Sequence, residues 1–221
     1  MVLASSFLSQ WNGWIGQLWP GLVVSLKLTG ASLAIGLPGG VLLAVGQSVR
    51  SRVVRAAILV IVEVGRGIPT LIVLYIVYFG LPHTGLTFTA FVSATITLAI
   101  GTAAYTSEMF RAGLLAVPRG QHEAAQAIGL SQTRQLLLVV LPQAIRIVIP
   151  PVLGFSIIVF QGTALAFSIA LPELLSRAYN IGSITFAFFS VLLLAGLMYA
   201  SVAIPVAQLV ALLERRTGSR I

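Results

Sequence analysis

Few residues of this chain carry charge, and several of its acids stand three or four positions before an arginine. The 221 residues include five acids and thirteen lysines and arginines. Glu63 precedes Arg66 by three positions, and Glu108 precedes Arg111 by three. On a helix such pairs share one face and can form ion pairs. The spacing therefore predicts structural charge pairing at both places.

Other kinds of chemistry lack the residues they need. The sequence has no cysteine and two histidines, and His83 and His122 stand alone, without a second ligand at metal-site spacing. No metal site is predicted. No glycine-rich phosphate loop of the G-x-x-x-x-G-K-[ST] type occurs, and no nucleophile stands beside a base. We therefore expect neither an ATP site nor a catalytic site in this chain.

The composition is that of a protein surrounded by lipid. Hydrophobic residues make up 58% of the chain and charged residues 8%, against about 25% charged in a typical soluble domain. Mean hydropathy is +1.04. The net charge is +8, but the basic residues are scattered between apolar stretches, which argues against nucleic-acid binding.

Five apolar stretches are long enough to cross a bilayer as helices. They predict an all-α polytopic membrane helix bundle with one transmembrane domain over 1–221. Trp11, Trp14 and Trp19 predict a segment at the membrane surface before the first span. Residues 170–183 are expected to lie outside as a short re-entrant helix. The expected spans are residues 21–46, 57–79, 87–108, 136–165 and 184–213.

Basic residues predict the orientation of the spans. Lysine and arginine are enriched in cytoplasmic loops, and Arg50, Arg52 and Arg55 follow the first span. The predicted N-terminus is therefore outside, and the C-terminus is cytoplasmic. Ten of the thirteen basic residues fall in or near segments assigned to the cytoplasm: Arg50, Arg52, Arg55, Arg111, Arg119, Arg134, Arg146, Arg215, Arg216 and Arg220.

One polar segment rich in small residues, 119–135, interrupts the apolar pattern. Residues 120–127 predict a short helix, and Gly129 suits the left-handed position that ends a helix. Ser131 is a natural N-cap for a second helix. Small side chains at Gly120, Ala124 and Ala125 would allow close approach by a partner protein.

Glu123-Ala124-Ala125 in this segment is followed by three residues, Gly129, nine residues, Val139, one residue, and Leu141-Pro142. This spacing resembles the EAA motif of ABC importer permeases, and we call residues 119–135 the coupling segment. The family more often has Ile at the position of Val139. In that family the motif forms the coupling helix that docks on the ATP-hydrolysing subunit. The resemblance therefore implies a type I ABC importer permease fold, with residues 120–129 as the coupling helix.

Three further stretches resemble the permeases for polar amino acids, so that the likeness covers roughly residues 22–216. In one departure, Gln161-Gly162-Thr163-Ala164-Leu165 stands where many members have Lys-Asp-Thr-Ser-Leu. Arg66, Pro69, Gln161 and Thr163 fall in the matching regions and are expected beside the translocation path. The three stretches are "RGIPTLIVLYIVYFGLP", "AYTSEMFRAGLLAVPRGQHEAA" and "LPQAIRIVIPP".

The resemblance also implies the partners. They are two ATPase subunits that bind ATP and Mg²⁺, a second permease subunit that is identical or paralogous, and a periplasmic or lipid-anchored solute-binding protein. The cargo would be a polar or charged amino acid, and the membrane the bacterial inner membrane. This chain itself would bind no cofactor.

Several residues keep two interpretations. Arg66 either pairs only with Glu63, the favoured reading, or meets the carboxylate of a transported amino acid. Glu173 either contacts the binding protein or pairs with Arg177 four residues on. Gln161 and Thr163 would line the path or only form hydrogen bonds between helices.

Two other functional classes are weighed against the ABC permease. An ion-gradient-driven transporter or channel would need acids near the middle of the membrane and often carries inverted repeats. Glu63 is the only candidate acid, and no repeat is visible. A membrane-embedded enzyme would need a metal or nucleophile site, which the sequence does not offer.

Overall fold

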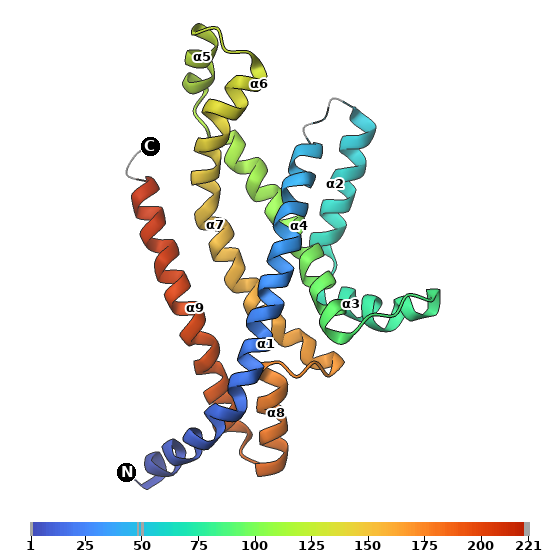
Figure 1. Ribbon diagram of the computed structural model, residues 1–221, viewed down its shortest axis with the longest axis vertical. Coiled ribbons are helices and arrows are strands. Elements are labelled where there is room, and N and C mark those ends of the chain that lie inside the picture. The colour runs from blue at the N-terminus through green and yellow to red at the C-terminus, as the bar shows by residue number, and fades with distance from the viewer. Residues whose placement is uncertain (1, 48, 50, 219–221) are drawn as a thin grey trace.

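The chain folds as an open bundle of helices, as Figure 1 shows. The computed structural model describes residues 2–47, 49 and 51–218. In chain order the elements are α1 (Val2–Gln47), α2 (Arg52–Gly67), α3 (Thr70–Tyr75), η1 (Ile76–Gly80), η2 (Leu81–Thr84), α4 (Ala90–Leu115), α5 (Arg119–Ala127), α6 (Gln132–Gln135), η3 (Leu136–Val140), α7 (Leu141–Gly162), η4 (Thr163–Ile169), α8 (Leu174–Thr185) and α9 (Phe188–Gly218). Of the short elements, η1 and η3 are π-helical, and η2 and η4 are 3-10 helices.

The described helices agree with the predicted all-α membrane bundle. Four stretches are long and apolar enough to cross a membrane, and a fifth is made of two helices joined at a sharp bend. The number of predicted spans is therefore matched when the bent pair is counted as one. The four unbroken stretches are Gln10–Gln47, Ala90–Leu115, Gln132–Ile169 and Phe188–Arg215.

The second span is not the continuous helix that was expected over residues 57–79. Its two halves, α2 and the stretch Thr70–Thr84, meet at an angle of 99°. Ile68 between them has φ −85° and ψ 129°, an extended conformation. The cause is Pro69, which lacks an N–H and disfavours helical backbone at the residue before it. The break places Arg66 and Pro69 on either side of a bend.

The structure also shows how the first and last spans begin. The three tryptophans belong to α1, the helix of the first span, and Trp14 is buried in the core. The last span begins at Phe188 rather than at residue 184, because Phe186 has φ +56° and separates α8 from α9. The expected short helix after residue 170 is present as α8.

Among the described helices, α1 and α4 make the most extensive contact. Gly36 and Gly40 of α1 face α4, and a Cβ on Gly36 would lie 2.5 Å from Thr102 Cβ. A Cβ on Gly40 would overlap the hydroxyl oxygen of Thr106. Small residues four positions apart allow two membrane helices to approach to backbone contact. The hydroxyls of Thr102 and Thr106 each donate to the carbonyl four residues earlier, at 2.7 Å, so they bring no unpaired donor into the contact.

We expect Gly40→Leu to destabilise the bundle by about 1–3 kcal/mol, because a side chain there must separate two helix backbones. Gly30→Leu is the matched control, since nothing lies within 4 Å of a Cβ at Gly30 of the same helix. Thermal unfolding of the detergent-solubilised protein measures the difference. Equal loss of stability in both variants would contradict close α1–α4 packing at Gly40.

Candidate functional site

The coupling segment projects from one end of the bundle as a short helix, a glycine turn and a second helix (Figure 1). α5 ends in a turn where Gly129 has φ +75°, as predicted. The turn is closed by hydrogen bonds from Gly129 N to Gln126 O at 2.9 Å and from Leu130 N to Ala125 O at 3.1 Å. Ser131 occupies the expected N-cap position, but its side chain makes no capping hydrogen bond.

The predicted coupling residues divide into an outer and an inner group. Gly120, Glu123, Ala124 and Gly129 are exposed, which leaves them free for contact with a partner. Ala125 is 3% exposed and faces its own chain. Its methyl group therefore helps to seat α5, so a bulky substitution there would disturb α5 itself. Leu141 and Pro142 lie at the start of α7 and are exposed.

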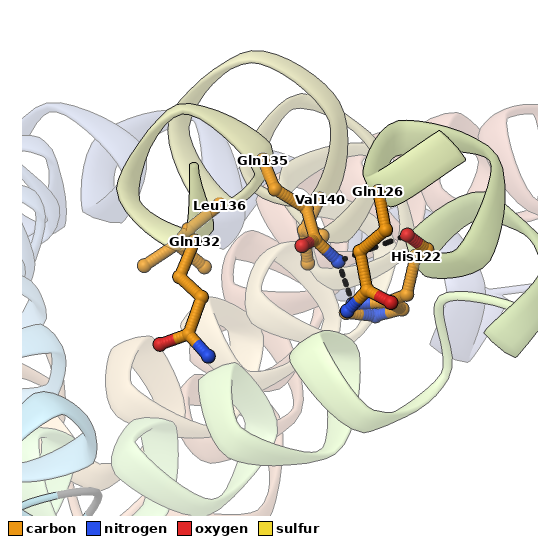
Figure 2. Close-up of a pocket in the computed structure, with 6 residues that line it drawn as sticks. All are labelled: His122, Gln126, Gln132, Gln135, Leu136 and Val140. Atoms are coloured by element: carbon orange, nitrogen blue, oxygen red, sulfur yellow. Dashed lines mark hydrogen bonds between the residues drawn. The ribbon is translucent and has the colours of Figure 1, made fainter. Parts of the chain in front are cut away.

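Two glutamine side chains hold α5 to the beginning of the fourth span. The Gln135 amide nitrogen donates to His122 Nδ1 at 2.8 Å and to His122 O at 3.3 Å, as Figure 2 shows. Gln143 Nε2 donates to Gln121 Oε1 at 3.2 Å and to Val139 O at 2.9 Å. The sequence showed His122 only as an isolated histidine. No pattern in the sequence indicated that Gln135 would be buried beside it.

The coupling segment also lies next to an apolar cluster and borders a cavity. Val117, Val140 and Ala144 form the cluster, with Leu114 and Ile147 packed against it. The cavity has a volume of about 300 Å³. Polar and apolar side chains line it in Figure 2: His122, Gln126, Gln132, Gln135, Leu136 and Val140.

The two segments expected beside the translocation path converge in the structure. Thr70, the residue after Pro69, and Gly162, between Gln161 and Thr163, line one cavity together with Thr97 of α4. The cavity measures about 10 Å³, room for one water at most and far too little for an amino acid. Thr163 is fully buried and donates to Phe160 O at 2.6 Å. In this arrangement Thr163 does not line an open passage.

The Glu63–Arg66 pair forms, as the favoured reading predicted. Arg66 NH1 lies 3.7 Å from Glu63 Oε1. The guanidinium also lies over the ring of Tyr105, 5.5 Å from its centroid, and the Tyr105 hydroxyl donates to Arg66 O at 3.4 Å. Arg66 thus ties the bend after α2 to α4. Its side chain is still 37% exposed, which leaves room for a second contact.

The Glu108–Arg111 pair forms too. Arg111 donates to Glu108 Oε2 from NH2 at 2.7 Å and from Nε at 3.0 Å. Two bonds from one guanidinium fix its orientation, so the structural interpretation holds for this pair. Among the described residues no cluster of three or more potential ligands for a metal ion occurs.

Neither interpretation of Glu173 was right. Its side chain is fully buried, so it does not form a surface for a binding protein, and within the described chain it has no ion pair with Arg177. Instead it caps α8, accepting from Leu175 N at 2.9 Å and Ser176 N at 2.7 Å. The Pro-Glu start before an apolar run was the one sequence feature that could have indicated this cap.

Two further donors reach Glu173 from other helices. Tyr199 OH of α9 donates to Oε2 at 2.9 Å, and Ser25 Oγ of α1 donates to it at 3.5 Å. Burial raises the pKa of the Glu173 carboxyl, while its hydrogen bonds to the two backbone N–H groups, Tyr199 and Ser25 act to lower it. The carboxyl is thus a buried junction of three helices.

Four unbroken stretches of membrane length and a broken second span, with a helix-turn-helix segment at one end, are the architecture of a membrane transport subunit. The family model for the "binding-protein-dependent transport system inner membrane component" matches residues 36–219. The chain belongs to this family and is the permease subunit of an ABC importer. Membership implies an inner-membrane location and three kinds of partner: an ATPase, a partner permease and a solute-binding protein.

Individual proteins similar to this chain are also permeases of amino acid transporters. The probable glutamine ABC transporter permease protein GlnP of Bacillus subtilis is 35% identical over 188 residues, 84% of this chain and 86% of the relative. The glutamate/aspartate import permease protein GltK of Escherichia coli O157:H7 is 33% identical over 206 residues, 90% and 92% of the two chains. A crystal structure of an amino acid ABC transporter with histidines has a TM-score of 0.89 at 30% identity, covering 95% and 98%.

Proposed function

We propose that this chain and a second permease subunit form the path by which a polar or charged amino acid enters the cell. The coupling helix, residues 120–129, docks on a separate ATPase subunit. One observation carries this proposal: the coupling segment stands at the end of the bundle (Figure 1), and its small residues Gly120, Ala124 and Gly129 are exposed. The amino-acid permeases among the relatives support the class of cargo.

The exposed side of α5 has the properties of a contact surface. Ile128, the residue directly after α5, is 75% exposed, and the one other large apolar residue of the segment, Leu130, is half-buried. Beside Ile128, Ala124 and Gly129 offer a surface without long side chains. An apolar side chain next to small residues favours close packing against another protein. The bonds from Gln135 and Gln143 hold this surface in a fixed position relative to α7.

The energy source in this proposal is the partner. The sequence contains no phosphate loop, so ATP and Mg²⁺ would be bound by two copies of the ATPase and no cofactor by this chain. The second permease subunit is either another copy of this chain or a paralogue. A solute-binding protein delivers the amino acid on the outer side. The whole chain acts as a single transmembrane domain in lipid.

Arg66, Pro69, Gln161 and Thr163 are proposed to lie beside the translocation path. Their support is the shared cavity between Thr70 and Gly162, which joins the bend of the second span to the end of α7. Since that cavity holds no more than a water, the passage must widen there during transport. Arg66 keeps an exposed guanidinium near this bend, and a guanidinium can bind a carboxylate through two parallel hydrogen bonds.

Substitution of Gly129 tests the coupling role. We expect Gly129→Val to abolish ATPase-driven uptake while the chain still inserts in the membrane, because a β-branched residue at φ +75° costs about 1–2 kcal/mol and blocks close approach. Gly85→Val is the matched control, since Gly85 has φ +87° in a turn between two spans. Co-purification of the ATPase should fall only for Gly129→Val. Normal ATPase retention and uptake in Gly129→Val would refute the docking role.

The path role of Arg66 has its own test. Arg66→Lys keeps the charge but loses the planar group that grips a carboxylate at two points. We expect the uptake rate to fall at least about tenfold, the cost of one charge-assisted hydrogen bond, with unchanged assembly. Arg146→Lys, an exposed arginine of α7, should transport normally. Unchanged uptake in Arg66→Lys and Arg66→Ala would leave Arg66 with the structural pairing alone.

The orientation is proposed from the basic residues, with the N-terminus outside and the C-terminus cytoplasmic. Reporter fusions after Ser5, Pro82 and Asn180 should lie outside, and fusions after Gln132 and Gly218 should lie in the cytoplasm. The readout is an enzyme reporter that is active on only one side of the membrane. A fusion after Gln132 that reports from the outside would invert the topology and remove the coupling segment from any cytoplasmic ATPase.

A further inference from the structure

A buried carboxylate joins three helices on the side of the bundle opposite the coupling segment. α8 lies at the far end of the molecule from α5 (Figure 1), and Glu173 is the residue that begins it. Four donors converge on its two oxygens: Leu175 N, Ser176 N, Tyr199 OH and Ser25 Oγ. Burying a carboxylate is costly unless it is hydrogen-bonded. The four hydrogen bonds offset this cost and hold the carboxylate at the junction of α1, α8 and α9.

The four hydrogen bonds fall into two groups. Those from Leu175 and Ser176 lie within the first turn of α8 and move with it. Those from Tyr199 and Ser25 cross to α9 and α1. Ser25 Oγ also accepts from Leu174 N at 3.4 Å, so α1 is bound to α8 twice. The crossing bonds fix the start of α8 relative to both long helices.

The close packing around this junction leaves little freedom for rearrangement. A Cβ on Gly21 of α1 would lie 2.9 Å from Glu173 O and from Leu174 Cα. Ala170 has φ +57° in the short connection from η4 to α8, and Leu171 N donates back to Ala166 O at 3.1 Å. A displacement of the Glu173 carboxylate would therefore move η4 as well as α8.

A chain of contacts leads from Glu173 to the end of α7. The Tyr199 ring packs against the Phe160 ring with centroids 5.1 Å apart. The carbonyl of Phe160 accepts the hydroxyl proton of Thr163 at 2.6 Å. Gln161 and Gly162 lie between these two residues, where the α-helix changes to the 3-10 helix η4. The orientation of Tyr199 is thus tied to the backbone of the proposed path.

We propose that Glu173 is a positioning residue for transport: through Tyr199 and Ser25 it holds the segment from Phe160 to Thr163 in the place that transport requires. It does not touch the substrate in this arrangement. The inference rests on the proposed function, because the segment that it positions is the one assigned to the translocation path.

Variants that remove only the crossing bonds test this role. Tyr199→Phe deletes the donated proton and keeps the ring on Phe160, and Ser25→Ala deletes the bonds to α1. Neither removes the bonds from Leu175 and Ser176 to the carboxylate. Tyr179→Phe and Ser201→Ala are matched controls, because both side chains are exposed and make no hydrogen bond to Glu173. Glu173→Gln completes the set: both carboxylate oxygens accept a backbone N–H, and an amide can accept only one of the two.

The measured quantity is the uptake rate per assembled complex, with the amount of complex taken from co-purification of the ATPase. We expect Tyr199→Phe and Glu173→Gln each to lower this rate about tenfold, the effect of losing one hydrogen bond to a charged group. The half-saturating substrate concentration should stay unchanged. Tyr199→Phe should add little in the Glu173→Gln background, because the Tyr199 hydroxyl acts through the carboxylate whose position Glu173→Gln already disturbs. Both controls should keep the wild-type rate.

Less complex with a normal rate per complex would assign Glu173 a purely structural role and overturn the inference. So would a wild-type rate in Tyr199→Phe, or an equal loss in Tyr179→Phe. Hydrogen exchange of the Thr163–Ile169 amides gives a second readout that needs no substrate. It should increase in Tyr199→Phe and not in Tyr179→Phe. If the wild-type complex imports no amino acid, the proposed cargo fails, and the exchange measurement still decides the role of Glu173.

Discussion

The arrangement of the bundle depends on the backbone contact between α1 and α4. Gly36 and Gly40 remove the side chains that would hold these helices apart, and the threonine hydroxyls opposite them are bonded within α4. The other spans are placed against this pair: α2 and α7 contact both helices, α3 contacts α4, and α8 and α9 contact α1. In lipid no hydrophobic force draws helices together, so this close packing must supply the association. Separating α1 from α4 would disrupt the surface against which α2 and α7 pack.

The surrounding lipid also constrains the polar side chains, because it offers them no hydrogen-bond partners. Within the membrane-crossing stretches, side-chain hydroxyls such as those of Thr29 and Thr95 donate to the carbonyl four residues earlier. Glu63 is paired with Arg66, and Glu173 accepts hydrogen bonds from four donors. At the break in the second span, the Tyr105 hydroxyl donates to the carbonyl of Arg66. These groups have local partners, as a medium without water favours, whereas the buried hydroxyls of Ser93 and Thr97 in α4 have no hydrogen-bond partner within the described chain.

The sequence predicted the features that depend on composition and on local backbone preference. Apolar length located the spans, and the glycine rule placed Gly129 in the left-handed turn. Prediction from the sequence failed where the three-dimensional arrangement of the chain determines side-chain partners and burial. The i,i+4 spacing of Glu173 and Arg177 suggested a pair, but Glu173 is the N-cap, with extended backbone, so its side chain does not share the helical face of Arg177. A nine-residue helix with alanines on several sides does not reveal that Ala125 faces inward. Hydropathy over residues 57–79 likewise does not register the bend that Pro69 imposes.

α7 connects the two regions that matter for the proposed function. It begins at Leu141, directly after the π-helical turn next to the coupling segment, and ends at Gly162 beside the proposed path. At one end Gln143 is bonded to Gln121 of α5, and at the other Phe160 packs on Tyr199. Pro150 and Pro151 lie inside α7 and cannot donate to carbonyls of the preceding turn, so the helix resists bending least at its middle. A displacement of α5 by an ATPase would therefore either move α7 as a unit or bend it there, and the junction at Glu173 would hold its far end in both cases.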